Sequence, residues 1–368
     1  MVEYEAENIK KKKRKEKNWI EDTIRNSNNF LEGNHKENNK KKSKKEEHKW
    51  KEIPTVSIAV IGSIIDNTQS QELATLVNHF KSQKAHTNLA GQIARAATIF
   101  HVDEIVVVDS KSMVNNSDEN ETGAQFLVRI LQYLETPQYL RRRLFPMHNS
   151  LKHVGLLPPL DAPHHVRKHE WSPFREGVTL EVNSSGPGGT LVDVGLRKNV
   201  KLEQVLKPGL RVTVAMGADR NFETDSLKKV VGENTPREEM GIYWGYKVRY
   251  APNFSSVFKN CLHKESYDYI VGTSEHGAVI KSSELSLPNF QHLLIAFGGL
   301  GGLEESIEED NNLKGKSVNE VFHSYLNTCP HQGSRTIRTE EAIFISLQYF
   351  QEPIIRAGRI FEASRHTS

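Results

Sequence analysis

A strand–helix–strand pattern that begins at residue 55 constrains the fold of this chain more than any other feature of its sequence. An unbroken apolar run, TVSIAVI at 55–61, follows Pro54 and is typical of a strand buried on both faces. Residues 71–80 and 85–100 have helical periodicity, and VDEIVVV at 102–108 predicts a second strand. Because parallel strands need a long crossover connection, this order predicts a βαβ unit in a parallel sheet.

The same α/β pattern continues to residue 135 and resumes after Cys261. A polar loop at 110–121 precedes a helix predicted at 124–135, which Pro137 ends. The later sequence predicts strands at 267–271, 292–297 and 325–326, and helices at 317–324 and 339–349. One α/β domain is therefore expected to be divided by an insertion.

The inserted segment has a different pattern of apolar and polar residues. Short alternating runs are separated by turns rich in glycine and proline, at 177–182, 190–194, 211–214 and 243–249. Their length and spacing favour a small OB-like β-barrel, a shape that often presents a face to single-stranded nucleic acid. We therefore divide the chain into a disordered lysine-rich tail (1–53), the first part of an α/β domain (54–150), the barrel with its linkers (151–258), the second part of the α/β domain (259–358) and a flexible C-terminus (359–368).

Basic charge is concentrated in the tail. Residues 1–51 contain 16 Lys and Arg against 10 Asp and Glu, whereas the whole chain has a formal net charge of +3. The runs KKKKRK and KKKSKK have the charge density that attracts RNA phosphates and nuclear import receptors. The alternative is a solvated extension with no specific partner. The runs predict RNA contacts at Lys10, Lys11, Lys12 and Lys13, and a nuclear or nucleolar location.

Composition argues against several kinds of protein. No stretch approaches the roughly 18 apolar residues of a membrane span, so we expect a soluble intracellular protein. The two cysteines, Cys261 and Cys329, form no CxxC pair, which argues against a disulfide framework or a zinc site. The pair His164 and His165 lacks the spacing of two ligands on one helix face, and this favours a structural or RNA-facing role over metal binding.

Three glycine-bearing segments each follow an apolar run. They are GTSEHG at 272–277, FGGLGG at 297–302 and NTCPHQGSRTIRTEE at 327–341. Ligands of open α/β sheets bind at the carboxyl ends of strands, where glycines let the backbone approach them. Each segment alone is compatible with an ordinary turn, but together they predict a pocket. Neither a dinucleotide GxGxxG nor a Walker loop is present, so dinucleotide binding and phosphoryl transfer have no support.

These segments resemble those of a known family. NLAGQIARAA at 88–97, followed by FHVDEIVVV, resembles the first motif of SPOUT methyltransferases, and the three glycine-bearing segments resemble the loops that hold S-adenosylmethionine in a deep trefoil knot. The similarity covers residues 54–358 and is to the eukaryotic and archaeal branch of class IV-like RNA methyltransferases with an inserted OB-like domain. It implies an S-adenosylmethionine-dependent enzyme with a knotted second half, and a homodimer whose active site is completed at the subunit interface.

The resemblance also implies roles for individual residues. Arg95 matches the arginine of the first motif and is a candidate catalytic or phosphate-orienting group, since a guanidinium binds phosphate through two hydrogen bonds; the alternative is a solvent-facing helix charge. Asp66 and Asn67 are candidates for contact with the target base, although such residues also form turns. Cofactor contacts, mostly through the backbone, are implied at Thr273, Ser274, Glu275, Gly277, Gly298, Gly299, Asn327, Thr328, Gly333, Ser334, Thr336 and Ile337.

Arg335 and Arg338 flank the last segment and are candidates for contact with RNA phosphate or with the surroundings of the cofactor. The favoured substrate is ribosomal RNA with uridine N3 as the acceptor, and no general base is evident. Two alternatives remain open: a catalytically idle RNA- or protein-binding scaffold with a role at chromosomes or the spindle, and a protein methyltransferase.

Overall fold

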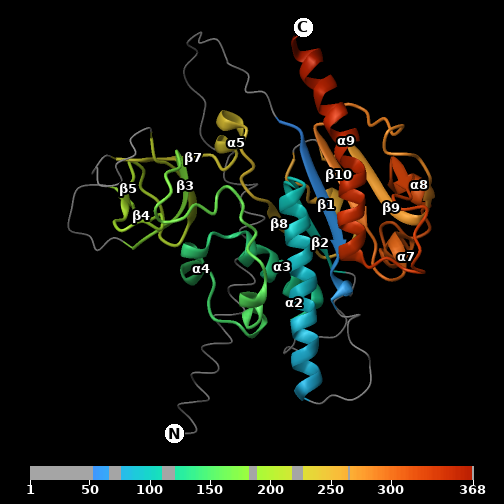
Figure 1. Ribbon diagram of the computed structural model, residues 1–368, viewed down its shortest axis with the longest axis horizontal. Helices are drawn as coiled ribbons and strands as arrows, with labels where there is room; N and C mark the ends of the chain where they lie inside the picture. The colour runs from blue at the N-terminus through green and yellow to red at the C-terminus, as the bar shows by residue number, and fades with distance from the viewer. Residues whose placement is uncertain are drawn as a thin grey trace. The chain divides into compact units, whose positions relative to one another are not determined.

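The computed structural model describes residues 53–65, 76–109, 121–181, 189–217, 227–263 and 266–366, with side chains left out at 76–82 and 359–366. Some sequence predictions concern residues outside these ranges. They are the predictions for the tail with Lys10 to Lys13, for Asp66 and Asn67, and for most of the loop at 110–121. The described strands form two sheets, one parallel and one antiparallel (Figure 1). None of the described helices is long and apolar enough to cross a membrane.

The parallel sheet has six strands and confirms the predicted α/β class. Its order is β11-β9-β10-β1-β2-β8. The strands are β1 (Thr55–Ile61), β2 (Glu104–Val108), β8 (Lys247–Ala251), β9 (Tyr269–Ala278), β10 (His292–Phe297) and β11 (Ser324–Leu326). Strands β1 and β10 begin and end where the apolar runs predicted.

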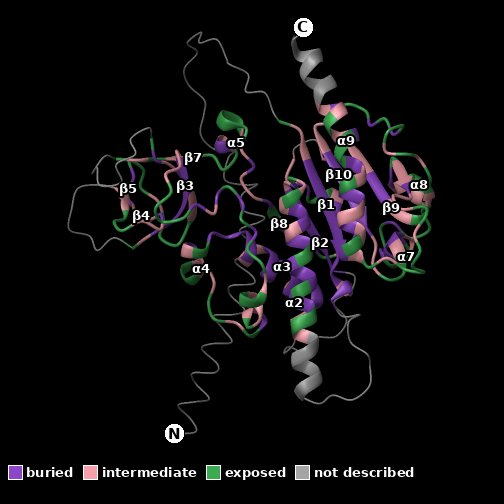
Figure 2. Cartoon of the chain, in the orientation of Figure 1, coloured by how far each residue is buried: buried purple, intermediate pink, exposed green. Residues whose placement is uncertain are grey.

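Helices cover both faces of this sheet. Ile58 and Val60 of β1 pack into one apolar cluster, and Ala59 packs into another on the opposite face, because successive side chains of a strand alternate. Burial on both faces explains the unbroken apolar runs (Figure 2). The first cluster includes α2 (Leu76–Ile99), α3 (Gly123–Glu135) and α9 (Thr339–His366), and the second includes α6 (Ser255–Lys259), α7 (Gly302–Glu309) and α8 (Val318–Val321).

Four helix predictions were wrong in extent. One continuous helix, α2, replaces the second predicted helix and the end of the first, because the polar residues at 81–84 contain no helix breaker. The last helix continues from Thr339 through Pro353 to His366. The helix predicted at 317–324 is the single turn α8, whereas α7 was not predicted.

The antiparallel sheet lies within the insertion. Its order is β5-β4-β3-β6-β7, and a parallel bridge between Leu202 and Lys228 joins the two outer strands, so the sheet curls on itself. Its strands are β3 (Phe174–Thr179), β4 (Leu191–Asp193), β5 (Val200–Lys201), β6 (Arg211–Ala215) and β7 (Lys229–Val231). The assignment of the run 243–249 to this barrel was wrong: its second half belongs to β8, which pairs with β2 in the parallel sheet.

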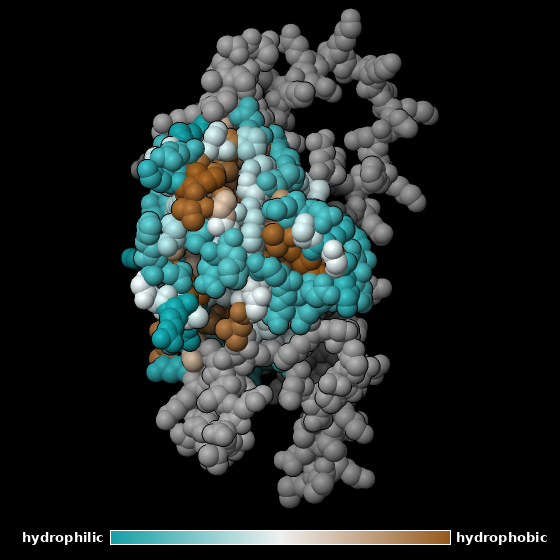
Figure 3. Space-filling model, turned by 90° about the vertical axis from the view of Figure 1, so that its right-hand side faces the viewer, coloured by the Kyte–Doolittle hydropathy of each residue, from teal (hydrophilic) through white to brown (hydrophobic). Residues whose placement is uncertain are grey.

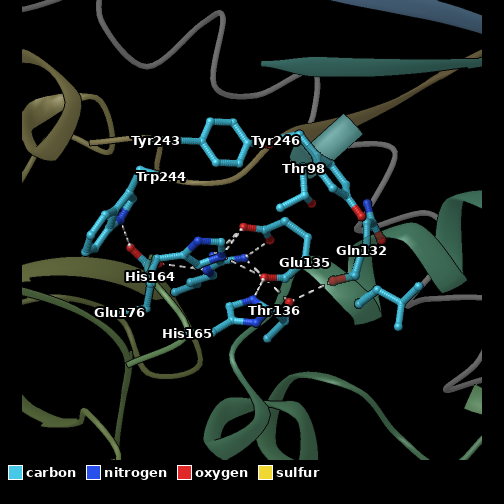
Figure 4. Close-up of polar contacts among 12 residues, drawn as sticks. Thr98, Gln132, Glu135, Thr136, His164, His165, Glu176, Tyr243, Trp244 and Tyr246 are labelled. Carbon is cyan, nitrogen blue, oxygen red and sulfur yellow. Dashed lines mark hydrogen bonds and ion pairs between the residues drawn. The ribbon is translucent and has the colours of Figure 1, made fainter. Parts of the chain in front are cut away.

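Short helices occupy the linkers, and a buried polar cluster joins α3 to the antiparallel sheet. The helices are η1 (Gly62–Ile64), α4 (Gln138–Leu144), η3 (Asn149–Leu151), η4 (Val154–Leu156) and α5 (Thr235–Met240). The Glu135 carboxylate at the end of α3 accepts two hydrogen bonds from Arg211 of β6, at 2.5 and 3.0 Å. The Nε2 atoms of His164 and His165 both lie within 2.8 Å of the Glu135 carbonyl oxygen (Figure 4). These contacts give the two histidines a structural role.

Candidate functional site

Three adjacent strands bring the glycine-bearing segments to one edge of the parallel sheet. Strands β11, β9 and β10 are neighbours and run parallel, so their carboxyl ends lie together. The expectation of a loop at 272–277 was wrong in part, because β9 continues to Ala278. Tyr325 pairs with Gly272 while the next residue, Leu326, pairs with Ala278. The five residues between them therefore bulge out of the pairing with β11, as a loop would.

Hydrogen bonds connect the three segments. Asn327 donates through its side-chain amide to the carbonyl oxygen of Glu275, at 2.8 Å. Thr339 donates to the carbonyl oxygen of Gly298, at 3.2 Å. Thr273 donates to the carbonyl oxygen of Ala296, the penultimate residue of β10, at 2.9 Å. The segments that the sequence singled out separately thus form one connected cluster.

Close backbone packing explains two of the glycines. A Cβ atom on Gly277 would lie 2.7 Å from the backbone nitrogen of Asn327 and would overlap the preceding carbonyl carbon. A Cβ atom on Gly298 would lie 2.6 Å from the carbonyl carbon of Gly302, which itself has a φ of 76°. Any side chain at these positions would push neighbouring segments apart.

The remaining candidates for cofactor contact lie on the same segments. The Ser274 hydroxyl accepts a hydrogen bond from the backbone N–H of His276, at 3.2 Å. The hydroxyls of Thr328 and Ser346 lie 2.7 Å apart, which ties the last segment to α9. Ser334 donates to the carbonyl oxygen of Thr336, at 2.8 Å. Gly299, Gly333 and Ile337 complete the set, and a Cβ atom on Gly333 would meet no atom within 4 Å.

The first two segments and the start of α7 carry charges that suit a positive rather than a negative ligand, whereas the third segment contains Arg335 and Arg338. The first two segments contain no lysine or arginine. Glu304 and Glu305 follow in the first turn of α7, and their carboxylates fold back beside Gly302 and Gly301. A polyphosphate at this helix start would face both carboxylates. A ligand that carries a positive charge and otherwise binds through neutral hydroxyl and backbone groups fits these residues.

Two side chains beside the cluster were missed by the sequence analysis as possible proton carriers. His276 Nε2 lies 3.8 Å from Glu275, and its Nδ1 lies 3.6 Å from Glu304. The sequence could have pointed to His276 as a site residue, because His276 is part of the motif at 272–277. Glu304 gave no signal, because α7 was not predicted.

The candidate arginines are not all brought together. Arg335 and Arg338 are exposed on the last segment, and Arg338 lies 3.5 Å from Glu340. Arg95 lies near the end of α2, beside the start of β1, at the opposite edge of the sheet from the glycine-bearing segments. Its guanidinium donates to the carbonyl oxygens of Pro159 and Leu160, at 3.3 and 2.8 Å. Within one chain, Arg95 therefore holds a linker and does not contact the cluster.

Comparison with known proteins identifies the family. A family model described as "Putative RNA methyltransferase" matches residues 55–350. A human protein named "28S rRNA (uridine-N(3))-methyltransferase" is 46% identical over 322 residues, covering 85% of this chain and 81% of the human protein. Proteins of the same name from mouse and Drosophila melanogaster are 46% and 41% identical, covering 83% and 82% of this chain and 78% and 62% of their own lengths. The chain belongs to this family of RNA methyltransferases.

Proposed function

We propose that the chain transfers a methyl group from S-adenosylmethionine to N3 of a uridine in the RNA of the large ribosomal subunit. The connected cluster at the carboxyl ends of β9, β10 and β11 carries the proposal, because it combines close backbone approach with neutral polar groups and carboxylates. The names of the human, mouse and Drosophila relatives support the substrate and the acceptor atom.

The residues of the cluster have distinct proposed tasks. When bound, S-adenosylmethionine supplies an electrophilic methyl group on a sulfonium. Backbone groups at 273–277, 298–299 and 327–337 hold and orient it, and the carboxylates of Glu275, Glu304 and Glu305 favour its positive charge. Uridine N3 must lose a proton before it can form a bond to the methyl carbon. His276, held between two carboxylates, is placed to accept that proton.

Finer features of the fold belong to the same proposal. The order of the five barrel strands and the parallel bridge between Leu202 and Lys228 support an OB-type barrel. The resemblance to SPOUT enzymes and the contact of the segment at 327–338 with the segment at 272–277 support a trefoil knot. A deep knot is rare in proteins and would hold the three segments together without side-chain help.

Labelled cofactor tests the function directly. We expect calorimetry to detect S-adenosylmethionine binding, and we expect ribosomal RNA from cells lacking the protein to accept the labelled methyl group as N3-methyluridine. Failure to bind S-adenosylmethionine at high micromolar concentration would instead indicate a scaffold. Label recovered from ribosomal protein fractions and not from RNA would indicate a protein methyltransferase.

In a homodimer, Arg95 of one subunit would contact the glycine-bearing cluster of the other subunit and so take part in catalysis. The side of the molecule that carries α7 and α8 shows separate apolar patches within a polar surface (Figure 3). Val279 and Leu300, which follow two of the strands of the site, are 61% and 82% exposed. Such exposed apolar side chains beside a site are suited to a subunit interface.

Mixed dimers test this role of Arg95. Arg95→Ala and Gly277→Ala should each abolish methyl transfer, the first by removing the guanidinium and the second by displacing the segment at 327–338. Mixing the two variants should restore about one quarter of the wild-type rate, because half of the dimers are mixed and each has one intact site. No recovery in mixtures in which differently tagged subunits are shown to copurify would rule out a shared site. Unchanged turnover of Arg95→Ala alone would rule out any catalytic role.

We further propose that the lysine-rich tail directs the protein to the nucleus or nucleolus. The runs at 10–15 and 40–45 support the proposal through their charge density alone. Imaging of the protein with residues 10–45 deleted should show it excluded from the nucleolus, and an unaltered distribution would remove the inference.

A further inference from the structure

We propose that a basic surface formed by α4 and the β4–β5 hairpin binds the phosphate backbone of the substrate RNA. This basic surface consists of Arg142, Arg143, Arg197, Lys198 and Lys201. The proposal rests on the proposed function for the identity of the ligand, but it concerns residues that take no part in cofactor binding. Its evidence is that the segments 138–144 and 191–201, which 46 residues separate in the chain, lie together with their basic side chains exposed.

Tyr139 fixes α4 against the hairpin. Gly195 begins the turn between β4 and β5 with a φ of 75°, and a Cβ atom there would lie 2.5 Å from the Tyr139 ring. The Tyr139 hydroxyl donates to the carbonyl oxygen of Glu176 in β3, at 2.9 Å. Arg143 then donates to Asp193 of β4, at 2.6 Å. The ring, the glycine and the ion pair hold the basic side chains of both segments on one surface.

The single acid of the two segments is already neutralised. Residues 138–144 and 191–201 contain six basic residues and one acid, Asp193. Asp193 is paired with Arg143 and also accepts a hydrogen bond from the backbone N–H of Gly195, at 3.0 Å. Its charge therefore cannot compensate the other cations, and the surface keeps a positive potential.

The successive arginines of α4 differ in their availability. Arg141 donates to the carbonyl oxygens of Leu134 and Thr136, so it stabilises the end of α3. Arg142 is exposed, and its side chain makes no hydrogen bond or ion pair with the described residues. In the hairpin, Arg197 and Lys198 are likewise exposed and unpaired within the described part of the chain. These three cations are free to bind an anion.

RNA fits this surface better than a protein does. None of the large apolar side chains that are exposed elsewhere in the described residues lies in these two segments. Protein interfaces have an apolar centre, whereas binding to a nucleic acid backbone relies on exposed cations that release counterions. Guanidinium groups also match phosphate oxygens through two hydrogen bonds.

The test compares two triple variants of the full-length chain. One carries Arg142→Gln, Arg197→Gln and Lys198→Gln, and the matched control carries the same loss of charge at exposed residues elsewhere, Lys259→Gln, Lys314→Gln and Lys316→Gln. Fluorescence anisotropy with labelled RNA of twenty uridines is measured over a range of salt concentrations. The tail is present in every variant and contributes equally.

We expect the first variant to bind this RNA at least about tenfold more weakly at 0.1 M salt, and its slope of log K against log salt to fall by about two, since each contact with single-stranded phosphate contributes about 0.7. The control should stay within about twofold of wild type. Equal losses in both variants, or none in the first, would overturn the proposal. Loss of binding to a polyglutamate probe without loss of RNA binding would overturn it in favour of an acidic protein.

Calorimetry with S-adenosylmethionine separates this proposal from the proposed function. Both variants should bind the cofactor as wild type does. If wild type fails to bind the cofactor while the first variant still loses RNA affinity, the catalytic proposal fails and the basic surface stands.

Discussion

Gly277→Ala is expected to reduce methyl transfer by at least about a hundredfold and to weaken S-adenosylmethionine binding by at least about tenfold. The new Cβ atom would overlap the backbone at Leu326 and Asn327. The neighbouring Ala278 pairs with Leu326 and accepts a hydrogen bond from the backbone N–H of Asn327, at 3.0 Å, so the overlap displaces the start of the segment at 327–338. The shift would break the hydrogen bond from Asn327 to Glu275 and separate two of the three groups of cofactor contacts.

A glycine in open surroundings provides the control. A Cβ atom on Gly155, in η4, would meet no atom within 4 Å, so Gly155→Ala should leave cofactor affinity and turnover unchanged. Calorimetry with S-adenosylmethionine and the methylation rate on ribosomal RNA check both variants. Wild-type affinity in a folded Gly277→Ala variant would show that the cluster is not the cofactor site.

Burial on both faces made strands β1 and β10 predictable from the sequence, but strand β8 was not recognised as part of the parallel sheet. Strands β1 and β10 alternate between two apolar clusters, so their whole length reads as apolar. Strand β8 is also covered, but Arg249 within it donates to Glu104 of β2, at 2.7 Å, with both side chains buried. Because this buried arginine stands between apolar residues, the sequence alternates between polar and apolar residues as it does in a strand with one face exposed to water. This is why the run at 243–249 was assigned to the barrel.

The composition of the candidate site was visible in the sequence, but its assembly was not. Glycines after apolar runs marked the three segments. Their proximity depends on the order β11-β9-β10, which is not the order in the chain and leaves no periodic signal. The sequence also did not show how far Arg95 lies from the candidate site, because that distance depends on the residue at which α2 begins. A motif arginine near the end of a 24-residue helix lies at the far edge of the sheet.

Arg211→Ala is expected to lower the free energy of unfolding by about 3–5 kcal/mol at neutral pH, the largest stability effect of any single change considered. Arg211 donates to the carboxylates of Glu135 and Glu176, whose side chains are 9% and 5% exposed. Removing the guanidinium leaves two buried carboxylates without their cation. Urea unfolding followed by tryptophan fluorescence suits the measurement, because the Trp244 ring N–H donates to Glu176, at 2.7 Å.

The matched control is an exposed ion pair between α4 and strand β4 of the antiparallel sheet. Arg143 lies 2.6 Å from Asp193, but the arginine side chain is 49% exposed, so Arg143→Ala should cost no more than about 1 kcal/mol. Adding Glu135→Gln to Arg211→Ala should restore part of the lost stability, since the uncompensated charge is then gone. A loss for Arg211→Ala no larger than the loss for Arg143→Ala would contradict the proposed role of the buried cluster.

The pH dependence of the Arg211→Ala effect tests whether an uncompensated carboxylate causes the destabilisation. Burial alone raises the pKa of Glu135, but Arg211 and His164 outweigh it and hold the pKa well below its usual range. A lowered pKa in the folded state contributes stability that is present above the unfolded value and is lost as pH falls through the folded value. Without Arg211, the largest effect that opposes burial is gone, so we expect the pKa of Glu135 to rise and the variant to gain relative stability as this carboxyl takes up a proton. The difference between wild type and variant should therefore shrink as pH falls from 7 to 4. A difference that stays constant over this range would show that lost packing, and not charge, causes the destabilisation.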